Sequence, residues 1–183
     1  MNTIIKTYVD SSIEWLRQRN LLVFPDDEMP TEMYDKSRSD EKENDEKPWK
    51  PIPSTVSDEE LIALENKIGH KFPNSYKEFL KYNHFYELHS ACGFQPFQHV
   101  IHRWKEKLTE NYFEVDLKEF MLDKGYIWIG DHEDLGFLCF DTNDKSVNDN
   151  EYPLVNLDYD VIDKPKIIYK NFLECLTKNT FTI

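Results

Sequence analysis

The pattern of apolar and polar positions predicts helices in the first half of the chain and strands in the second. In residues 10–22, Ile13 and Leu16 lie on one face of a short helix. Either Ser11 or Ser12 precedes that face and can cap the helix through its hydroxyl oxygen. The chain is therefore expected to open with a short amphipathic helix.

The strongest helix signal begins at Ser57. Ser57 and Glu60 have the spacing of a capping box, apolar residues follow at helical spacing, and Gly69 ends the segment. The step Phe72-Pro73 then opens a second helix with proline at its first position. Two consecutive helices are therefore expected between residue 57 and residue 83.

In the second half of the chain the apolar pattern predicts strands followed by one helix. In residues 126–141 a run of β-branched and aromatic residues breaks at Gly130 and resumes from Gly136, which predicts a β-hairpin. Residues 152–157 predict a third strand, and residues 167–176 a closing helix. Helices followed by strands and a last helix indicate an α+β fold with an antiparallel sheet packed against the helices.

Composition limits the classes of function. Of 183 residues, 39% are hydrophobic and 14% aromatic, which is enough large apolar surface to form a core. The net charge of −13 is uneven, because residues 26–47 carry −6 and residues 131–163 carry −9. Such a chain repels nucleic acid and anionic membranes, and it attracts basic partners. We therefore expect a protein partner and no nucleic-acid or membrane partner.

The two acidic segments differ in kind. Residues 35–47 contain no apolar side chain, so nothing offsets the entropy of ordering them, and a mobile linker is predicted. Prolines then hold residues 48–53 in an extended strap. The expected division is residues 1–50, an N-terminal helix plus acidic linker, and residues 51–183, an α+β domain.

The second acidic segment, residues 131–163, is interleaved with apolar residues, so its carboxylates should lie on ordered structure and could form a rigid contact surface. The expected partner-binding residues are Asp131, Glu133, Asp134, Asp144, Asp149 and Glu151.

Two groups of polar residues are candidates for a catalytic or metal-binding site, and neither has a pattern typical of one. The run from Asp131 to Asp134 contains carboxylates and an imidazole, but successive residues on a strand point to opposite faces, so a solvated turn is the simpler interpretation. His99 and His102 could share one side of a short helix, yet a third ligand is missing. No catalytic residue, metal or cofactor is predicted, and the chain is not expected to be an enzyme.

Cysteines and chain ends indicate the compartment. Cys92, Cys139 and Cys175 form no CxxC pair and are expected to be buried thiols in a reducing cytosol. A signal-peptide core and a membrane-spanning run are both lacking, so a soluble cytoplasmic protein is expected. Tryptophans expected in the core, or as contact residues if exposed, are Trp49, Trp104 and Trp128.

The capped helix and the hairpin together resemble the SUKH superfamily, which includes bacterial immunity proteins and fungal cell-wall regulators. The residues that carry the resemblance are Leu64-Glu65, Gly69, Phe72-Pro73, Tyr76, Phe79, Leu80, Gly136, Asp141, Phe172 and Leu173. Asn83-His84 departs from the usual Asn-Gly of the family. The resemblance covers residues 51–180 and implies a single α+β domain without established catalytic residues.

Many bacterial members of this superfamily are implied to bind and neutralise a cognate toxin, often a nuclease. Together with the acidic charge, this leads to the hypothesis of an immunity protein that occludes a basic toxin domain stoichiometrically. One alternative is a non-catalytic regulatory or scaffold module that binds a cellular protein through residues 26–47. A weaker alternative is a metal-dependent hydrolase at residues 131–134.

Overall fold

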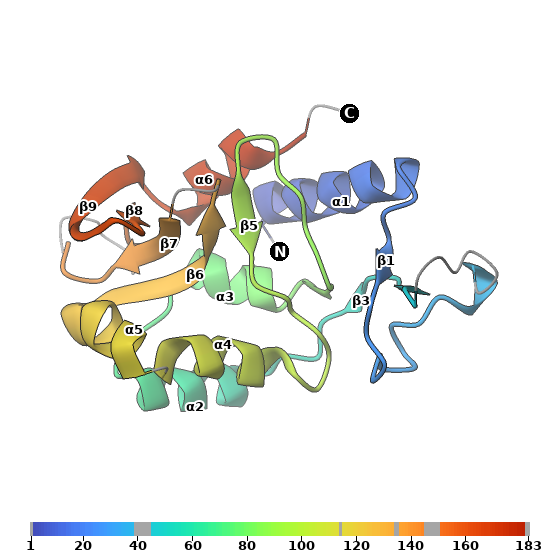
Figure 1. Ribbon diagram of the computed structural model, residues 1–183, viewed down its shortest axis with the longest axis horizontal. Helices are drawn as coiled ribbons and strands as arrows, with labels where there is room; N and C mark the ends of the chain where they lie inside the picture. Colours follow the sequence, from blue (N-terminus) through green and yellow to red (C-terminus); the bar gives the residue numbers. More distant parts are fainter. Residues whose placement is uncertain (1, 39–44, 114, 134–135, 145–150, 182–183) are drawn as a thin grey trace.

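The structure is a computed structural model that describes residues 2–38, 45–113, 115–133, 136–144 and 151–181, and it has the predicted α+β architecture (Figure 1). The α-helices of the described residues are α1 (Thr3–Gln18), α2 (Asp58–Ile68), α3 (Asn74–Leu80), α4 (Trp104–Phe113), α5 (Val115–Phe120) and α6 (Phe172–Asn179). Two 3-10 helices are η1 (Lys36–Arg38) and η2 (Leu122–Lys124). The strands are β1 (Val23–Phe24), β2 (Lys47–Pro48), β3 (Ile52–Pro53), β4 (Asn83–His84), β5 (Phe94–Pro96), β6 (Tyr126–His132), β7 (Gly136–Asp141), β8 (Leu154–Asp158) and β9 (Val161–Tyr169).

The main sheet is five-stranded and antiparallel, in the order β5-β6-β7-β8-β9. Its centre is the predicted hairpin, in which Tyr126 pairs with Asp141 and His132 pairs with Gly136. The register shifts between Trp128 and Gly130, at the glycine where the apolar run breaks. The third strand is also confirmed as β8. Two-residue pairs join β1 to β2 and β3 to β4, so the strap around Trp49 is extended as predicted.

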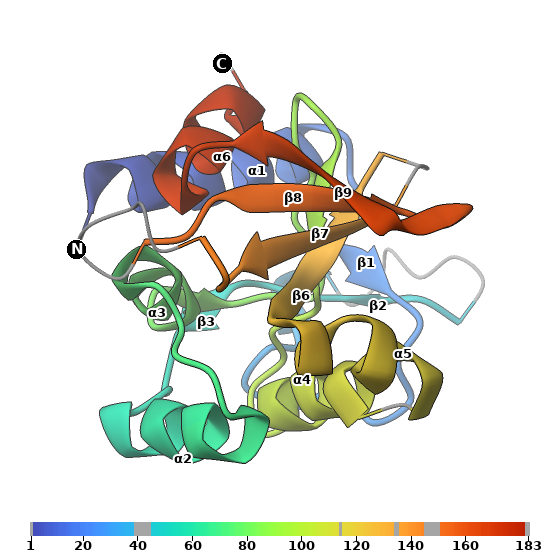
Figure 2. The ribbon, with the colours of Figure 1, turned by 90° about the vertical axis from the view of Figure 1, so that its left-hand side faces the viewer.

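One face of the main sheet, the inner face, packs against α1, α3 and α6 (Figure 2). Phe172 of α6 lies at the centre of this core, and its ring centroid is 5.3 Å from that of Tyr76, 5.4 Å from that of Phe79 and 5.8 Å from that of Phe140. Near-perpendicular aromatic pairs of this kind add to the free energy of burial. The sheet contributes the buried residues Ile127, Ile129, Leu138, Phe140 and Leu154.

The first helix is longer than the sequence pattern predicts. Helix α1 begins at Thr3, because the side chain of Asn2 accepts a hydrogen bond from the amide of Ile4 (2.9 Å) and so caps the helix. The predicted serine cap is wrong, since both serines are buried inside the helix. The hydroxyl of Ser11 donates to the carbonyl of Tyr8 (3.0 Å), and the hydroxyl oxygen of Ser12 accepts from the amide of His89 (2.7 Å).

Helices α2 and α3 follow the sequence closely. The capping box is present, with the hydroxyl of Ser57 accepting from the amide of Glu60 (3.2 Å) and the carboxylate of Glu60 accepting from the amide of Ser57 (3.0 Å). Gly69 ends α2 in a left-handed conformation with φ of 76°. Pro73 is the residue before α3, not its first residue, because the helix starts at Asn74.

The predicted helix at residues 167–176 is only half correct. Residues up to Tyr169 form β9, which pairs with β8, and helix α6 starts at Phe172. Ile167 and Ile168 are β-branched and suit a strand as well as a helix, so pairing with β8 decides the outcome. The side chain of Asn171 accepts from the amide of Glu174 (2.9 Å) and caps the helix after this strand.

The N-terminal segment packs on the same core as the rest of the chain. Helix α1 lies beside α6 in both views (Figures 1 and 2). Ile5, Met33 and Trp49 are fully buried in the cluster that also contains Phe172. Of the predicted linker, residues 39–44 lie outside the described part of the chain. The acidic segment that contains this linker, residues 26–47, is joined to the core at its first residue, Asp26.

A small polar cluster makes that connection. The carboxylate of Asp26 forms an ion pair with Arg103 and accepts a hydrogen bond from the hydroxyl of Tyr86 (2.5 Å). Burial alone would raise the pKa of Asp26, but the hydrogen bonds from Arg103, Tyr86 and the amide of Glu28 lower it. The charged carboxylate is therefore the form that the folded protein stabilises.

Replacing Asp26 by Asn should loosen this connection. We expect Asp26→Asn to lower the free energy of unfolding by about 1–2 kcal/mol, because hydrogen bonds to a charged group are lost. Limited proteolysis should then cut residues 20–50 faster. The neighbouring Asp27, whose side chain is fully exposed, provides the control Asp27→Asn, which should change neither measurement. Equal effects of the two substitutions would contradict the structural role of Asp26.

Candidate protein-binding surface

The expected partner-binding residues are divided between two ends of the main sheet. Asp131 and Glu133 lie at the end where β6 turns into β7. Asp144 and Glu151 lie at the opposite end, between β7 and β8, because the antiparallel β7 carries the chain back. Asp134 and Asp149 lie outside the described residues. The described members therefore do not form one continuous acidic face.

Glu151 also has a structural role. One carboxylate oxygen accepts from the amide of Ser75 (2.9 Å), and the other accepts from the Ser75 hydroxyl (2.6 Å). Ser75 lies in the first turn of α3, where the backbone amides have no partner within the helix. Glu151 therefore caps α3 from the loop that precedes β8.

Asp131 lies on the outer face of the main sheet, the face opposite Phe172. It is half-buried and stands in register with Gln95 of β5 and Phe137 of β7. The hydroxyl of Tyr159 lies 3.5 Å from one of its carboxylate oxygens. Burial raises the pKa of Asp131, and hydrogen bonding by Trp128 and Tyr159 only partly offsets that effect. A carboxylate in this setting would gain from a cationic neighbour.

Four aromatic side chains cross the outer face beside Asp131, and we call them the aromatic ladder: Phe97, Trp128, Phe137 and Tyr159. Successive ring centroids are 4.6, 4.7 and 4.7 Å apart, and the planes of each pair are nearly perpendicular. The first three rings are half-buried, and Tyr159 is 49% exposed. On β9, Ile167, which pairs with Val155 of β8, is 60% exposed. The ladder is therefore an ordered aromatic surface that water reaches.

Sequence reasoning found only part of this surface. Trp128 was expected to be in the core or, if exposed, a contact residue, and it is half-buried, whereas Trp49 and Trp104 are buried. Phe137 and Tyr159 were not singled out. Alternation along the hairpin does place Trp128 and Phe137 on the outer face, but their contact depends on strand register, which local sequence does not specify.

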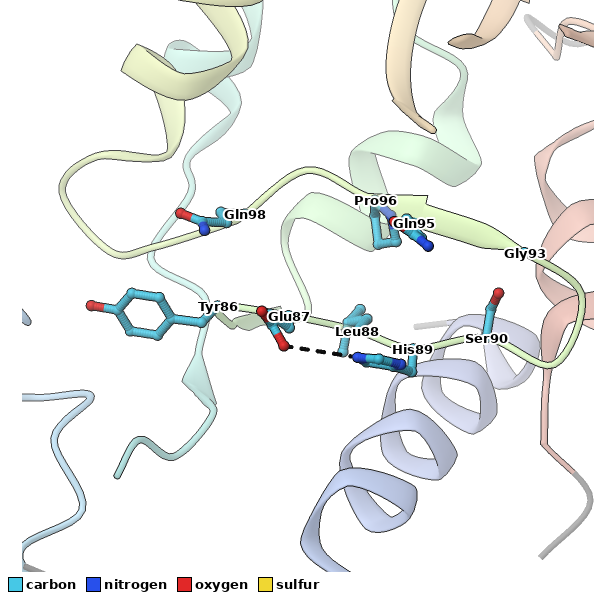
Figure 3. A pocket seen from close by; sticks show the side chains of 9 residues that line it. All are labelled: Tyr86, Glu87, Leu88, His89, Ser90, Gly93, Gln95, Pro96 and Gln98. Atoms are coloured by element: carbon cyan, nitrogen blue, oxygen red, sulfur yellow. Dashed lines mark ion pairs between the residues drawn. The ribbon is translucent and has the colours of Figure 1, made fainter. Parts of the chain in front are cut away.

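A cleft lies beyond β5 at the edge of the main sheet (Figure 3). It has a volume of about 240 Å³ and separates residues 86–90 from residues 93–98. Most of its lining side chains are polar, including Glu87, Ser90 and Gln95. Gln95 connects the cleft to the ladder surface, since it is the residue of β5 that pairs with Asp131.

Other predicted chemical features do not converge on a site. Within the described residues, no group of three or more His, Cys, Asp or Glu side chains is arranged to hold a metal. The expected shared helix face of His99 and His102 is wrong, because His99 is buried in extended backbone that bridges to Phe85, while His102 is exposed. The two residues thus point into different surroundings.

The cysteines are only partly as expected. Cys139 and Cys175 are buried, and burial raises the pKa of both thiols. Cys92 is exposed, so the expectation of three buried thiols is wrong for this residue, which lies in a turn before β5. Of the helices that the structure describes, none combines the length and the apolar character needed to span a bilayer.

Residues 55–178, well over half of the chain, match the SMI1 / KNR4 family (SUKH-1). The matched region runs from the strand-to-helix connection before α2 into α6, and it agrees with the resemblance found at residues 51–180. A comparison with curated proteins finds no match. The chain therefore belongs to the SMI1 / KNR4 (SUKH-1) family.

Proposed function

We propose that this protein is an immunity protein that binds a basic toxin domain, such as a nuclease, and neutralises it by stoichiometric occlusion. The observation that carries the proposal is the aromatic ladder with Asp131 at its side. Ordered aromatic residues that remain accessible to water are characteristic of binding hot spots. Membership of the SUKH-1 family, whose members are typically immunity proteins, supports the same interpretation.

The charge around the ladder indicates the chemistry of the partner. Exposed or half-buried carboxylates lie at the same end of the sheet, and they outnumber the two exposed lysines of β9, Lys164 and Lys166. Complementary charge accelerates encounter with a basic partner and penalises acidic ones. The carboxylates are Asp131, Glu133, Asp158, Asp160 and Asp163. Asp134 belongs to the same proposed contact set by its position in the sequence.

The remaining members of the predicted set contribute less in this proposal. Asp144 and Glu151 belong to the connection between β7 and β8, at the far end of the sheet from Asp131, and Asp149 lies outside the described residues. A partner centred on the ladder would reach them only if it extended along the sheet. The carboxylate of Glu151 is already bonded to Ser75, so we propose a supporting role for this group and a central role for Asp131 and Glu133.

The proposal is tested by mixing the purified protein with the toxin domain encoded by the neighbouring reading frame. We expect a one-to-one complex that weakens as salt is added and that loses toxin activity. Tyr159→Ala should weaken binding about tenfold or more, because it removes an aromatic contact. Glu133→Lys should slow association by reversing a charge at the ladder.

Glu110→Lys, at an exposed glutamate of α4 that is not part of the proposed contact set, is the matched control and should bind like the unchanged protein. Unfolding midpoints of all variants establish that each one folds. Absence of a complex with the toxin domain would refute the proposed function. A complex that is insensitive to both Tyr159→Ala and Glu133→Lys would refute the ladder as its contact surface.

A further inference from the structure

The cleft beside β5 is a built feature of the fold. Residues 85 and 99 bridge through two backbone hydrogen bonds of 3.1 and 3.0 Å, and beyond this bridge the two segments separate. The outer segment is held away from β5 by other partners, because the amide of His89 donates to Ser12 of α1 and the amide of Ala91 donates to the carbonyl of Asn179 of α6 (3.0 Å). The cleft therefore stays open for a structural reason.

Hydrogen-bond acceptors face this space from both segments. Figure 3 shows Gln95 pointing from β5 toward the outer segment and Ser90 pointing back toward β5. Gln98 and Glu87 contribute an amide and a carboxylate to the lining. The hydroxyl oxygen of Ser90 is buried and lacks a hydrogen-bond partner among the described residues. Because buried polar atoms normally have partners, the Ser90 hydroxyl oxygen is available to accept a hydrogen bond from a group that enters the cleft.

The electrostatics of the cleft favour a cation. Burial raises the pKa of Glu87; the nearby His89, whose ring nitrogen lies 3.8 Å from the carboxylate, lowers it, and the charge of Glu46 raises it. Of the described residues that line the cleft, none is lysine or arginine. An anion would meet the Glu87 carboxylate in the cleft and the charge of Glu46 close by, whereas a cation would be attracted by both.

The volume of the cleft and the arrangement of its acceptors indicate which cationic group it binds. A volume of about 240 Å³ lies below the roughly 300–1,000 Å³ of pockets for drug-sized ligands, so a single side chain is the fitting occupant. An arginine side chain brings five N–H donors in a plane, whereas lysine brings three at one point. Acceptors from Glu87, Ser90 and Gln95 surround the space and match a planar set of donors. We propose that this cleft binds an arginine side chain of the partner protein.

The proposal rests on the proposed function only for the source of the arginine, so the cleft can be tested without the toxin. The probe is N-acetyl-arginine amide, with N-acetyl-citrulline amide as its uncharged analogue and N-acetyl-lysine amide as the point-charge analogue. We expect the arginine probe to shift the backbone NMR signals of residues 86–98 saturably, in the millimolar range. The citrulline and lysine probes should bind about tenfold more weakly, since citrulline lacks the charge and lysine lacks the planar set of donors.

The variant Glu87→Gln keeps the shape of the cleft and should weaken the arginine probe about tenfold. It should not lower the unfolding midpoint, because it removes a charge that burial disfavours. Glu119→Gln, an exposed glutamate of α5, is the matched control. Equal shifts with arginine and citrulline, or an unchanged response in Glu87→Gln, would overturn the proposal. If the toxin complex forms but either of these results is found, only the proposal of an arginine-binding cleft is refuted. If no toxin complex forms but the cleft binds the arginine probe as expected, only the proposed toxin-binding function is refuted.

Discussion

Replacing Glu65 by Ala should lower the free energy of unfolding by about 3 kcal/mol, because it breaks a buried, fully bonded carboxylate. The Glu65 side chain is only 1% exposed. Its carboxylate lies 2.7 Å from the ammonium group of Lys77 and 3.0 Å from that of Lys71, and it accepts from the amide of Phe72 (2.9 Å). These bonds join α2 to the start of α3, so their loss leaves an amide and an ammonium group without an acceptor. Urea unfolding at pH 7 measures the difference.

The pH dependence provides a second test of Glu65. Burial alone would raise its pKa, but the hydrogen bonds from Lys77, Phe72 and Lys71 lower it below the usual 4.5. A lowered pKa means that this contribution is complete above about pH 4.5 and is lost as the pH falls toward the folded value. Glu65→Gln should therefore flatten the stability profile below pH 4.5. Glu59→Ala, an exposed site on the same helix, should cost much less, and an equal cost would contradict the assigned role.

Glu65 illustrates what a sequence can and cannot indicate. The Leu64-Glu65 step contributes to the family resemblance, yet nothing in the sequence identifies Lys77 and Phe72 as its partners. The capping box at Ser57 and the central hairpin were predictable because their residues interact over short separations. Glu151 caps α3 from 76 residues away, and a contact at that separation depends on the complete fold.

For the candidate surface too, the sequence indicated the local features but not those that depend on the complete fold. Sequence alone placed Asp131 and Glu133 on ordered structure at the hairpin. It did not reveal that Asp144 and Glu151 lie at the opposite end, because that separation follows from the direction of β7. The cleft was missed since residues 84–99 fit neither helical nor strand periodicity. Its opening depends on backbone bonds to α1 and α6, which come from the two ends of the chain.

A buried histidine pair provides the other large effect. The rings of His84 and His99 lie 4.8 Å apart, and both side chains are buried. One ring nitrogen of His84 lies 3.0 Å from the carbonyl of His99 and the other 3.0 Å from the amide of Thr55, so the first must donate and the second must accept. This arrangement requires the neutral imidazole. A ring nitrogen of His99 donates to the carbonyl of Leu80 (2.7 Å).

Acid should therefore destabilise the protein through this pair. Burial lowers the pKa of His99 from 6.5 to about 3, helped by His84, and burial also lowers the pKa of His84. Above about pH 6.5 the imidazole of His99 is neutral in both the folded and the unfolded protein. Below this pH the unfolded chain binds a proton at His99, whereas the folded protein does not. Stability thus falls as the pH drops from about 6.5 toward 3, by about 2 kcal/mol at pH 5 for His99 alone.

Urea unfolding at pH 7 and pH 5 measures this loss. His99→Phe should be less stable at pH 7, because the carbonyl of Leu80 loses its donor, but it should lose less stability between pH 7 and pH 5 than the unchanged protein. His102→Gln removes an exposed histidine three residues away and should keep the full loss. The difference between the two pH values separates protonation from packing, since a packing defect lowers stability equally at both. An undiminished loss in His99→Phe would place the acid sensitivity elsewhere. A diminished loss would assign it to the neutral imidazole of His99, which lies beside Trp104 with the two ring centroids 5.5 Å apart.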